Sequence, residues 1–572
     1  MSRVSHSLFR FIAVLALLFL LTAVFTFPLI FRIKSGTPGV SRFTETLDVL
    51  WYFWWLKYAK VHRLPSGSCA FTAYPFGLDF SRLISYPAFT WVSGWLAYFT
   101  DEIFTYNLWV ILSFILSGIA MYGLVNYLTG SALAAMFSAL AFAFCPYHLA
   151  RVEQHLGLAQ IQWMPFFIFA LIKLKEKTSI KTLSVAVLAL SAVVAFDYYY
   201  AFFMAVVAAA FWLFSLATNQ HPFKVFIMLV AVFALSFLLT LPLNWQLLYA
   251  NSPLSAGGVV RDFSDLFKQS ARPLSYFLPA AENPFLGGLA RSLIGSPYYG
   301  ESFTEHALYL GWVPLVLSFA AVRVWLRKRA SRSEERGAKI DFAIGLFTFL
   351  AVVAWLFSQP PWWRWGPIKI YMPSFFIYRL LPMFRAYCRF GIVVMLCVSV
   401  LAGFGMKFIL ERFKARKSRV AATLFICGLV LFEFLNFPPF RFLDLSHTPA
   451  AYAWIKGQPG DLVIAEFPLD YNGANSTYRF FQTKHGKRTI NGTLEGTPAN
   501  RFSRAVFQKI NNNTVGYLAR MQVRYVLVHA TDYSKEETRA AADELKILRA
   551  LAGLKLVRDF GGIEIYEVIA SR

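Results

Sequence analysis

From residue 11 to residue 437 the chain consists of long apolar runs separated by charged or aromatic loops, most of them short. A helix that crosses a bilayer needs about 20 mainly apolar residues. The pattern therefore predicts about eleven membrane-spanning segments, at 11–31, 105–127, 132–147, 158–174, 183–196, 200–217, 225–247, 307–326, 340–357, 390–410 and 420–437. Two more apolar stretches, 46–60 and 88–99, are too short to cross and are typical of helices that lie at the membrane surface.

Beyond residue 437 the pattern changes, because charged residues become more frequent. The apolar runs shorten to strand length at 462–467, 523–529 and 563–568. Residues 535–551 have the periodicity of a helix. We therefore predict a polytopic α-helical transmembrane domain at 1–437 and a small α/β domain at 438–572.

Basic residues divide the loops into two classes. The short loops rich in Lys and Arg are 173–181, 327–339 and 411–419. The positive-inside rule places these loops in the cytoplasm, together with Arg3 and Arg10 before the first span. The N-terminus is then cytoplasmic, and the C-terminal domain and two long loops, 32–104 and 248–306, are extracytoplasmic. A connector as long as the second loop is more typical of a functional segment than of a linker.

Composition agrees with an integral membrane protein. The 572-residue chain is 57% hydrophobic and 15% charged, against about 25% charged in soluble domains. The basic inner loops explain most of the net charge of +24, so we expect no nucleic-acid partner. The apolar run at 11–31 lacks a signal-peptide cleavage site and is expected to remain as a span. The five cysteines form no metal-binding pattern, although Cys69 and Cys388, both in outer loops, could pair.

Candidate chemistry begins in the first outer loop. Glu45 and Asp48 are three residues apart and would share one face of a helix. An aromatic run at 51–55 follows them, and we interpret it, like the run at 362–365, as an anchor at the membrane–water boundary. Acidic side chains at the edge of a membrane are costly to keep and usually serve a function.

The other ionisable residues next to spans lie on the same predicted side. The outer-face set is Glu45, Asp48, Glu153, His155, Asp197, Glu301, Glu305, His306, Arg385 and Arg389. Charged groups near membrane depth usually face a cavity or a partner. Their collection on one side predicts a single site at the outer face.

Three loose motifs carry a resemblance to a known superfamily. Asp48 and Trp54 fit D-x-x-x-x-x-W, residues 74–77 read Tyr-Pro-Phe-Gly, and residues 381–390 fit Leu-Pro-x-Phe-Arg-x-x-x-Arg-Phe. With its early span, large first outer loop and outer C-terminal domain, the chain resembles the GT-C superfamily of membrane glycosyltransferases. Within that superfamily it is most similar to uncharacterised prokaryotic multi-spanning proteins.

The resemblance implies an enzyme that takes a sugar from a polyprenyl-phosphate carrier and attaches it outside the cytoplasm. The acceptor, a glycan, a lipid or a protein, stays open. In the superfamily an acid of the first outer loop is the catalytic base or helps to bind a metal; Asp48 holds that place here, with Glu45 as the alternate. A divalent cation also stays open, because Glu45-x-x-Asp48 replaces the Asp-x-Asp of some branches.

The remaining roles are expectations of the same kind. Arg385 and Arg389 would bind the departing lipid phosphate, because guanidinium groups match phosphate oxygens. The sugar or acceptor pocket would be lined by Glu153, His155, Glu301 and Glu305. All of these side chains should converge with Asp48 on one outward cavity.

Each side chain also has a structural interpretation. Asp48 could cap the helix that starts near it, and Arg385 and Arg389, four residues apart, could anchor a helix to lipid headgroups. For the whole protein, a transporter or flippase of a lipid-linked or cell-envelope intermediate is the main alternative, and a non-enzymatic envelope assembly factor is another. A transporter is expected to have internal repeats and polar groups near the membrane midplane, whereas the acids here cluster at the outer edge.

Overall fold

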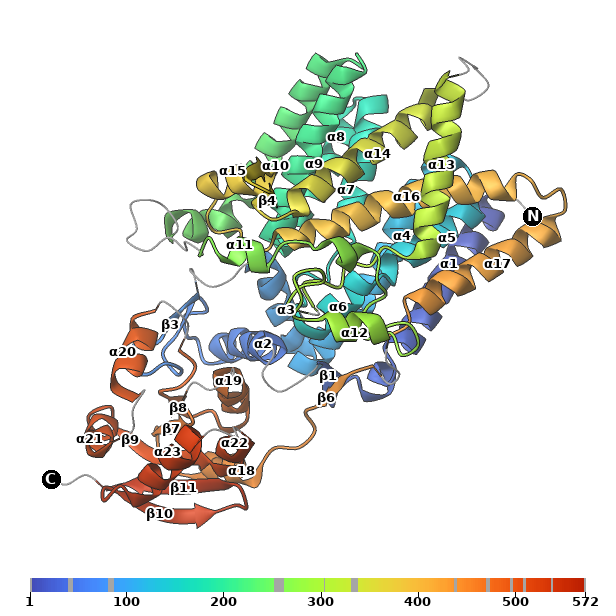
Figure 1. Ribbon diagram of the computed structural model, residues 1–572. Coiled ribbons are helices and arrows are strands. Elements are labelled where there is room, and N and C mark those ends of the chain that lie inside the picture. Colours follow the sequence, from blue (N-terminus) through green and yellow to red (C-terminus); the bar gives the residue numbers. More distant parts are fainter. Residues whose placement is uncertain are drawn as a thin grey trace. The chain divides into compact units, whose positions relative to one another are not determined.

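The structure is a computed structural model of the 572-residue chain (Figure 1). It describes residues 3–39, 45–80, 87–250, 262–302, 304–330, 338–436, 440–469, 474–493, 497–507, 511–535 and 539–569.

The chain forms two compact units, each built from separate segments. The first, called the span unit here, comprises Met1–Phe31, Ser85–Phe89 and Leu108–Arg441, and the second, called the sheet unit, comprises Arg32–Ile84, Thr90–Asn107 and Phe442–Arg572. The predicted division at residue 437 keeps the first outer loop with the spans, whereas the structure groups most of it with the C-terminal segment. The reason is that α2 (Glu45–Val61) packs against α19 (Ala474–His485).

The span unit is helical. Its longer helices are α1 (Arg3–Phe25), α5 (Ala132–Ala143), α6 (Pro146–Gln154), α7 (Trp163–Glu176), α8 (Ile180–Phe196), α9 (Tyr198–Ala217), α10 (Pro222–Ala250), α13 (Trp312–Ala330), α14 (Ala338–Ser358), α15 (Pro373–Leu380), α16 (Gly391–Leu410) and α17 (Arg416–Glu433). The helices α3 (Pro87–Phe99) and α4 (Glu102–Thr129) have residues in both units. Each of the predicted spans overlaps one of these helices, and 46–60 and 88–99 coincide with α2 and α3.

Within the described residues, five helices are long and apolar enough to cross a membrane: Glu102–Thr129, Tyr198–Ala217, Pro222–Pro242, Lys339–Ser358 and Tyr387–Leu410. A sixth span results if α5 and α6, bent by 41° at their junction, cross together. The apolar parts of α1 and α8 are shorter, at Phe9–Phe25 and Ile180–Phe196. The protein is therefore a polytopic helical membrane protein, and the count of about eleven spans stays a prediction.

Helix α16 is the most deeply buried of these spans, with α5, α13 and α14 packed around it. Glycines permit the close approach: a Cβ on Gly405 would lie 2.0 Å from the carbonyl oxygen of Leu317 in α13, and one on Gly403 would lie 2.5 Å from Oγ of Ser138 in α5. Small residues at helix contacts are a recurrent feature of membrane bundles, because there packing rather than water exclusion holds helices together.

The variant Gly405→Ala is expected to destabilise the span unit by about 1–3 kcal/mol, the usual cost of overpacking, because the obstructing atom belongs to the backbone. In Gly428→Ala, in α17, the added Cβ meets nothing within 4 Å, so the unfolding midpoint should stay the same or rise slightly. Thermal unfolding of the purified protein in detergent measures both. Equal midpoints for Gly405→Ala and wild type would contradict the close α13–α16 contact.

The sheet unit contains a five-stranded mixed sheet of order β10–β11–β9–β7–β8. Its strands are β7 (Val463–Phe467), β8 (Arg488–Thr489), β9 (Val523–His529), β10 (Leu554–Asp559) and β11 (Ile563–Val568). β7 runs parallel to β8 and β9, and β9, β11 and β10 form antiparallel pairs. Three of these strands, β7, β9 and β11, lie where the apolar runs predict them.

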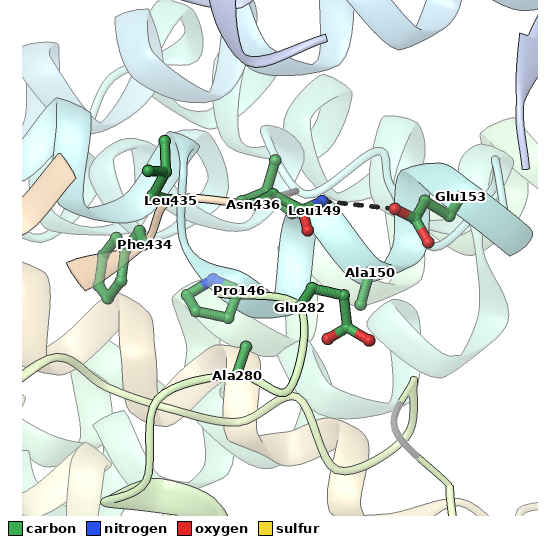
Figure 2. A pocket seen from close by; sticks show the side chains of 9 residues that line it. All are labelled: Pro146, Leu149, Ala150, Glu153, Ala280, Glu282, Phe434, Leu435 and Asn436. Atoms are coloured by element: carbon green, nitrogen blue, oxygen red, sulfur yellow. Dashed lines mark hydrogen bonds between the residues drawn. The ribbon is translucent and has the colours of Figure 1, made fainter. Parts of the chain in front are cut away.

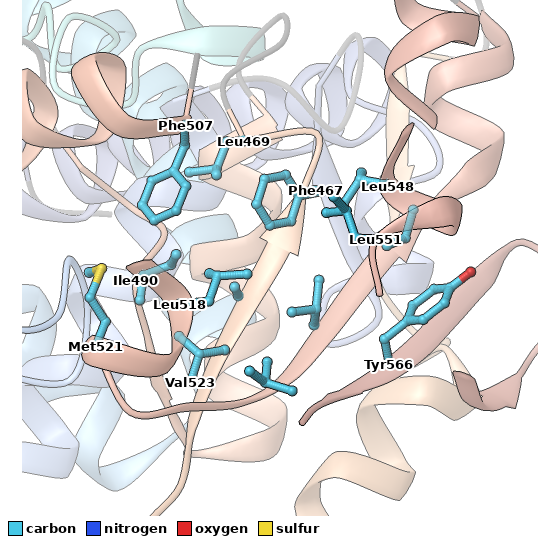
Figure 3. Packing of buried hydrophobic residues seen from close by; sticks show 14 of the residues in the cluster. Phe467, Leu469, Ile490, Phe507, Leu518, Met521, Val523, Leu548, Leu551 and Tyr566 are labelled. Carbon is cyan, nitrogen blue, oxygen red and sulfur yellow. The ribbon is translucent and has the colours of Figure 1, made fainter. Parts of the chain in front are cut away.

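Helices cover the sheet and enclose its core. They are α18 (Ala450–Gly457), α19, α20 (Pro498–Phe507), α21 (Asn512–Arg520), α22 (Ala530–Lys535) and α23 (Arg539–Ala550). All five residues of β7 are buried, as expected for a parallel strand covered on both faces. Figure 3 shows Phe467 at the centre of the main apolar cluster, with side chains from α20, α21 and α23 around it.

The described residues also form three two-stranded sheets. β1 (Gly36–Pro38) pairs with β6 (Phe442–Asp444), and β2 (Ser68–Cys69) pairs with β3 (Leu78–Asp79) in the sheet unit. In the span unit β4 (Trp362–Trp365) pairs with β5 (Ile368–Tyr371).

The aromatic run at 51–55 differs from its interpretation as a membrane anchor. Trp51 and Trp55 are fully buried in the sheet unit, with their rings stacked 6.2 Å apart. The Trp51 indole N–H donates to Oε1 of Gln482 at 2.9 Å. These rings therefore belong to an apolar core that joins α2 to residues 69–80 and to Ala499 of α20, and the Trp51 hydrogen bond links α2 to α19.

Candidate functional site

The first candidate group surrounds Asp48 in the sheet unit. Its Oδ1 lies 3.1 Å from Nη1 of Arg479, and the Ser476 hydroxyl donates to its Oδ2 at 2.9 Å. Arg479 is buried, with a side chain 2% exposed, and also donates to the carbonyl oxygen of Gly492 at 3.0 Å. Asp48 keeps 22% of its side chain exposed. The carboxylate is thus fixed on its α19 side, with Oδ1 buried, while part of the Asp48 side chain stays exposed.

The surroundings of Asp48 change its acidity. Burial raises the pKa of Asp48, the positive charge of Arg479 and the Ser476 hydrogen bond oppose that rise, and the charge of Glu45 adds to it. The net effect is a pKa above the ordinary value. A carboxylate with a raised pKa is a stronger base near neutral pH than an ordinary aspartate.

The two acids lie in the first turn of α2, as their spacing predicts. The helix begins at Glu45, so Asp48 is inside the first turn rather than at the cap position that was its alternative interpretation. Negative charge is favourable there because of the helix dipole. Glu45 is exposed to solvent.

The second candidate group is a buried ion cluster in the span unit. The Glu305 carboxylate accepts two hydrogen bonds from Arg151, at 3.1 and 2.7 Å, and two from Arg389, at 3.1 and 2.6 Å. The Cys388 thiol lies 3.4 Å from Oε2 of the same carboxylate. Side chains of Arg151, Glu305 and Arg389 are 0%, 11% and 13% exposed. One carboxylate thus holds two guanidinium groups, and the cluster carries a net positive charge.

Opposing influences act on the carboxylate of Glu305. Burial alone would raise its pKa, but the charges and hydrogen bonds of Arg151 and Arg389 outweigh burial and hold the pKa well below its usual range.

Arg151 is absent from the sequence-based candidates. The sequence contained a signal for it, because Arg151 lies close to the end of the apolar run at 132–147. A charged residue at that depth in a membrane usually has a partner.

Arg385 and Arg389 do not form the helical pair that their spacing predicts. Residues 381–386 are not helical, and only a short 3₁₀ turn, η4 (Tyr387–Phe390), follows them. Arg385 forms its own ion pair, 2.9 Å from Asp265 in α11 (Asp265–Lys268), with a side chain 37% exposed. Pro382 and the non-helical backbone before η4 break the helix that would have paired the two arginines, so Arg385 stays partly exposed and Arg389 is enclosed.

Glu153 lines a separate pocket of the span unit, together with Glu282 and Asn436 (Figure 2). Its Oε1 accepts from the Asn436 amide at 3.3 Å, and its Oε2 is buried without a hydrogen-bond partner among the described residues. Glu282 lies 3.8 Å from Arg441, and burial raises the pKa of Glu282. The two carboxylates make this pocket acidic.

The remaining predicted residues lie apart from these groups. His155 follows α6. Asp197 precedes α9, and its carboxylate accepts from the backbone N–H of Tyr199 at 2.7 Å. Glu301 is exposed, and its charge acts on Arg272. Neither His155 nor Glu301 shares a hydrogen bond or ion pair with Glu305 among the described residues.

The described residues contain no group of three or more His, Cys, Asp or Glu side chains arranged to hold a metal ion. All five cysteines are free, so Cys69 and Cys388 are not paired. Glu45 and Asp48 belong to the sheet unit, and the other predicted site residues belong to the span unit. Convergence of all of them on one cavity stays a prediction.

Comparison with known proteins gives a family and a fold. Residues 10–432 match a family described as "Domain of unknown function (DUF6311)". No curated protein matches the chain. Among solved structures, the arabinofuranosyltransferase AftD from Mycobacteria is similar over 97% of this chain and 40% of its own, with a TM-score of 0.57 and 12% identity. This chain thus spans less than half of that protein's length.

The oligosaccharyltransferase AglB from Archaeoglobus fulgidus, solved with an inhibitory peptide and a dolichol-phosphate, is similar over 98% of this chain and 74% of its own. The TM-score is 0.56 and the identity 13%. The same protein in its apo form gives a TM-score of 0.55 at 12% identity. These likenesses show a GT-C-like fold, which confirms the resemblance to the GT-C superfamily that the layout of the chain indicates.

Proposed function

The chain belongs to the DUF6311 family and has a GT-C-like fold, and from these two facts we propose that it is a membrane glycosyltransferase. It moves a sugar from a polyprenyl-phosphate carrier to an acceptor on the extracytoplasmic face. The observation that carries the proposal is the fold shared over nearly the whole chain with AftD, an arabinofuranosyltransferase, and with AglB, an oligosaccharyltransferase solved with a dolichol-phosphate.

Asp48 is the base in this proposal. Its carboxylate takes the proton from an acceptor hydroxyl while that oxygen forms a bond to the anomeric carbon of the sugar. The bond between the anomeric carbon and the phosphate oxygen breaks, and polyprenyl phosphate leaves with the electron pair. The support is the fixed position of Asp48 on Arg479 and Ser476, its exposed fraction of 22% and its raised pKa.

Arg385 is the better candidate of the two arginines for the carrier phosphate. Its side chain is 37% exposed, and its guanidinium group pairs with Asp265, whereas the side chain of Arg389 is 13% exposed and bound to Glu305 through two hydrogen bonds. A guanidinium group binds phosphate oxygens in a planar fork and neutralises the charge that develops on the leaving group. In this proposal Arg389 and Arg151 do not contact the phosphate, and the net positive charge of their cluster with Glu305 favours its binding.

The variant Arg385→Gln is expected to raise the KM for the lipid-linked donor about tenfold or more, because one charge-assisted hydrogen bond to phosphate is worth about 1.5–3 kcal/mol. Arg364→Gln removes the same charge from the exposed β4 strand and should leave the KM unchanged. Steady-state kinetics with varied donor concentration distinguishes them. Equal KM values for the two variants would show that Arg385 does not bind the carrier phosphate.

The proposal as a whole is tested with purified protein and a panel of polyprenyl-phosphate sugars, with and without a chelator. Formation of a glycosylated product or release of free polyprenyl phosphate supports it. Movement of an intact lipid-linked substrate across a vesicle membrane without cleavage would instead identify a flippase. The proposal includes the orientation of the protein in the membrane. The basic loops are cytoplasmic by the positive-inside rule, so the N-terminus is in the cytoplasm and residues 438–572 are outside. Labelling of introduced cysteines from either side of a vesicle tests this orientation.

A further inference from the structure

The orientation of the Arg479 side chain is set by a hydrogen bond rather than by its ion pair with Asp48. Nη2 of Arg479 donates to the carbonyl oxygen of Gly492 at 3.0 Å. Nη1 lies 3.1 Å from Oδ1 of Asp48, but that oxygen accepts no hydrogen bond from a described residue. A Coulomb attraction depends mainly on distance, whereas a hydrogen bond also requires alignment. The Gly492 carbonyl therefore determines how the guanidinium group is turned toward Asp48.

The backbone at Gly492 is itself held in place through Asn491, which is fully buried. The carbonyl oxygen of Asn491 accepts from the Thr72 hydroxyl at 3.0 Å and from the Ala73 backbone N–H at 2.8 Å. The Asn491 side chain accepts from the backbone N–H of Glu466 in β7 at 2.7 Å and donates to the carbonyl oxygen of Glu466 at 2.8 Å. The peptide unit between residues 491 and 492 is thus anchored both to the sheet and to the first-loop segment.

Position 492 has room for glycine only. Gly492 has a φ of +81°, in the left-handed region that a Cβ disfavours. A Cβ there would lie 2.3 Å from Oγ1 of Thr72 and 3.2 Å from Nε of Arg479. Both atoms belong to the series of contacts that ends at Asp48. A side chain at position 492 would therefore displace Thr72 and Arg479 together.

We propose that Gly492 is a positioning residue for Asp48 and acts through Arg479. Its carbonyl group orients the guanidinium group, and its missing side chain leaves space for Thr72 and Arg479. The inference rests on the proposed function, in which Asp48 is the base. The contact between Arg479 and Asp48 can nevertheless be measured without any substrate, because it also contributes to the stability of the sheet unit.

The test compares two glycine variants that carry the same backbone strain. Gly492→Ala is the test variant. Gly460→Ala is its control, because Gly460 has a φ of +82° and an added Cβ there meets nothing within 4 Å. Each is made in the full-length protein with and without Asp48→Asn, and unfolding midpoints are measured in detergent. Thr72→Val keeps the size of the side chain and removes its hydroxyl group, and it gives the same comparison if Gly492→Ala does not fold.

We expect Asp48→Asn to lower the midpoint by the same amount in wild type and in Gly460→Ala, because in both the buried Arg479 loses the charge that it faces. In Gly492→Ala and in Thr72→Val the loss should be about half as large, since the guanidinium group is already displaced from Asp48. A full-sized loss in Gly492→Ala, or in Thr72→Val where Gly492→Ala does not fold, would overturn the proposal.

Kinetics give a second readout that a purely structural glycine would not change. In Gly492→Ala, kcat should fall about tenfold or more with the KM for the donor unchanged, because the base is misplaced. The acidic limb of the pH profile should move to higher pH, because the influence of Arg479 that lowers the pKa of Asp48 is weakened. Gly460→Ala should keep the wild-type kcat and pH profile.

The two readouts distinguish failure of this inference from failure of the proposed function. A wild-type protein that transfers no sugar rejects the transferase, and the unfolding midpoints still show whether Gly492 positions Asp48. A wild-type protein that transfers sugar, with an unchanged kcat and pH profile in Gly492→Ala, rejects the positioning role and leaves the transferase standing.

Discussion

Replacement of Asp48 by Asn is expected to lower the rate of sugar transfer by about 10²–10⁴-fold, the usual contribution of a general base. The amide keeps the size of the carboxylate and can still accept a hydrogen bond from Ser476, but it cannot take a proton. The measurement is the initial rate with the donor that the wild type uses. A variant that transfers sugar at the wild-type rate would show that Asp48 is not the catalytic base.

The control for this variant must separate chemistry from stability. Arg479 is buried, and removal of the charge that it faces leaves a guanidinium group without its anion, which is costly in itself. Glu45→Gln removes an exposed acid from the same helical turn and should change the rate much less. Rates are therefore compared per folded molecule, with the folded fraction taken from size-exclusion profiles and unfolding midpoints.

The pH profile supplies a readout that a purely structural aspartate would not change. Asp48 acts as a base only when ionised, so activity falls as the pH drops through its pKa. Burial places that pKa above the ordinary value, so the fall should begin at a higher pH than for an exposed aspartate. In Arg479→Gln the influence that lowers the pKa is gone, and the acidic limb should move to still higher pH.

Replacement of Glu305 by Gln is expected to destabilise the protein by about 3–5 kcal/mol, because it leaves the buried charges of Arg151 and Arg389 uncompensated. Glu301→Gln, four residues earlier and exposed, should stay within about 0.5 kcal/mol of wild type. Unfolding midpoints in detergent measure both. Adding Arg151→Met to Glu305→Gln should recover part of the loss, since one of the two unpaired charges is then removed.

The pH dependence of this effect follows from the sign of the shift. The pKa of Glu305 is held well below its usual range, so its stabilisation is fully present above about pH 4.3 and is lost only as the pH falls through the lowered value. The difference between wild type and Glu305→Gln should therefore be constant between about pH 6 and about pH 8. A difference that changes across that range would contradict the doubly bonded arrangement of this carboxylate.

The sequence predicts well those features that depend on local pattern. Apolar runs indicate the helices and three strands of the sheet, and the spacing of Glu45 and Asp48 indicates a shared helical turn. It predicts poorly what depends on distant partners. Nothing near Asp48 in the chain points to Arg479. The aromatic run at 51–55 could not be distinguished from a membrane anchor, because Phe71, Phe80 and Gln482, which bury Trp51 and Trp55, lie in other segments.

The same limit explains the ion cluster. Glu305 was a candidate for lining a pocket, and Arg389 for binding phosphate, because each was considered alone. Their mutual neutralisation, and the participation of Arg151, depend on three segments that meet only in the folded span unit. A charged residue beside an apolar run gives a signal that a partner exists, but not which residue it is.

The pairing of α2 with α19 has a consequence for biosynthesis. Ser476 lies 428 residues after Asp48, so at a synthesis rate of about 5–20 residues per second the first-loop helix emerges roughly 20–90 s before its partner. During that interval the Asp48 carboxylate lacks both Arg479 and Ser476, and a chain that stops before α19 never gains these two partners.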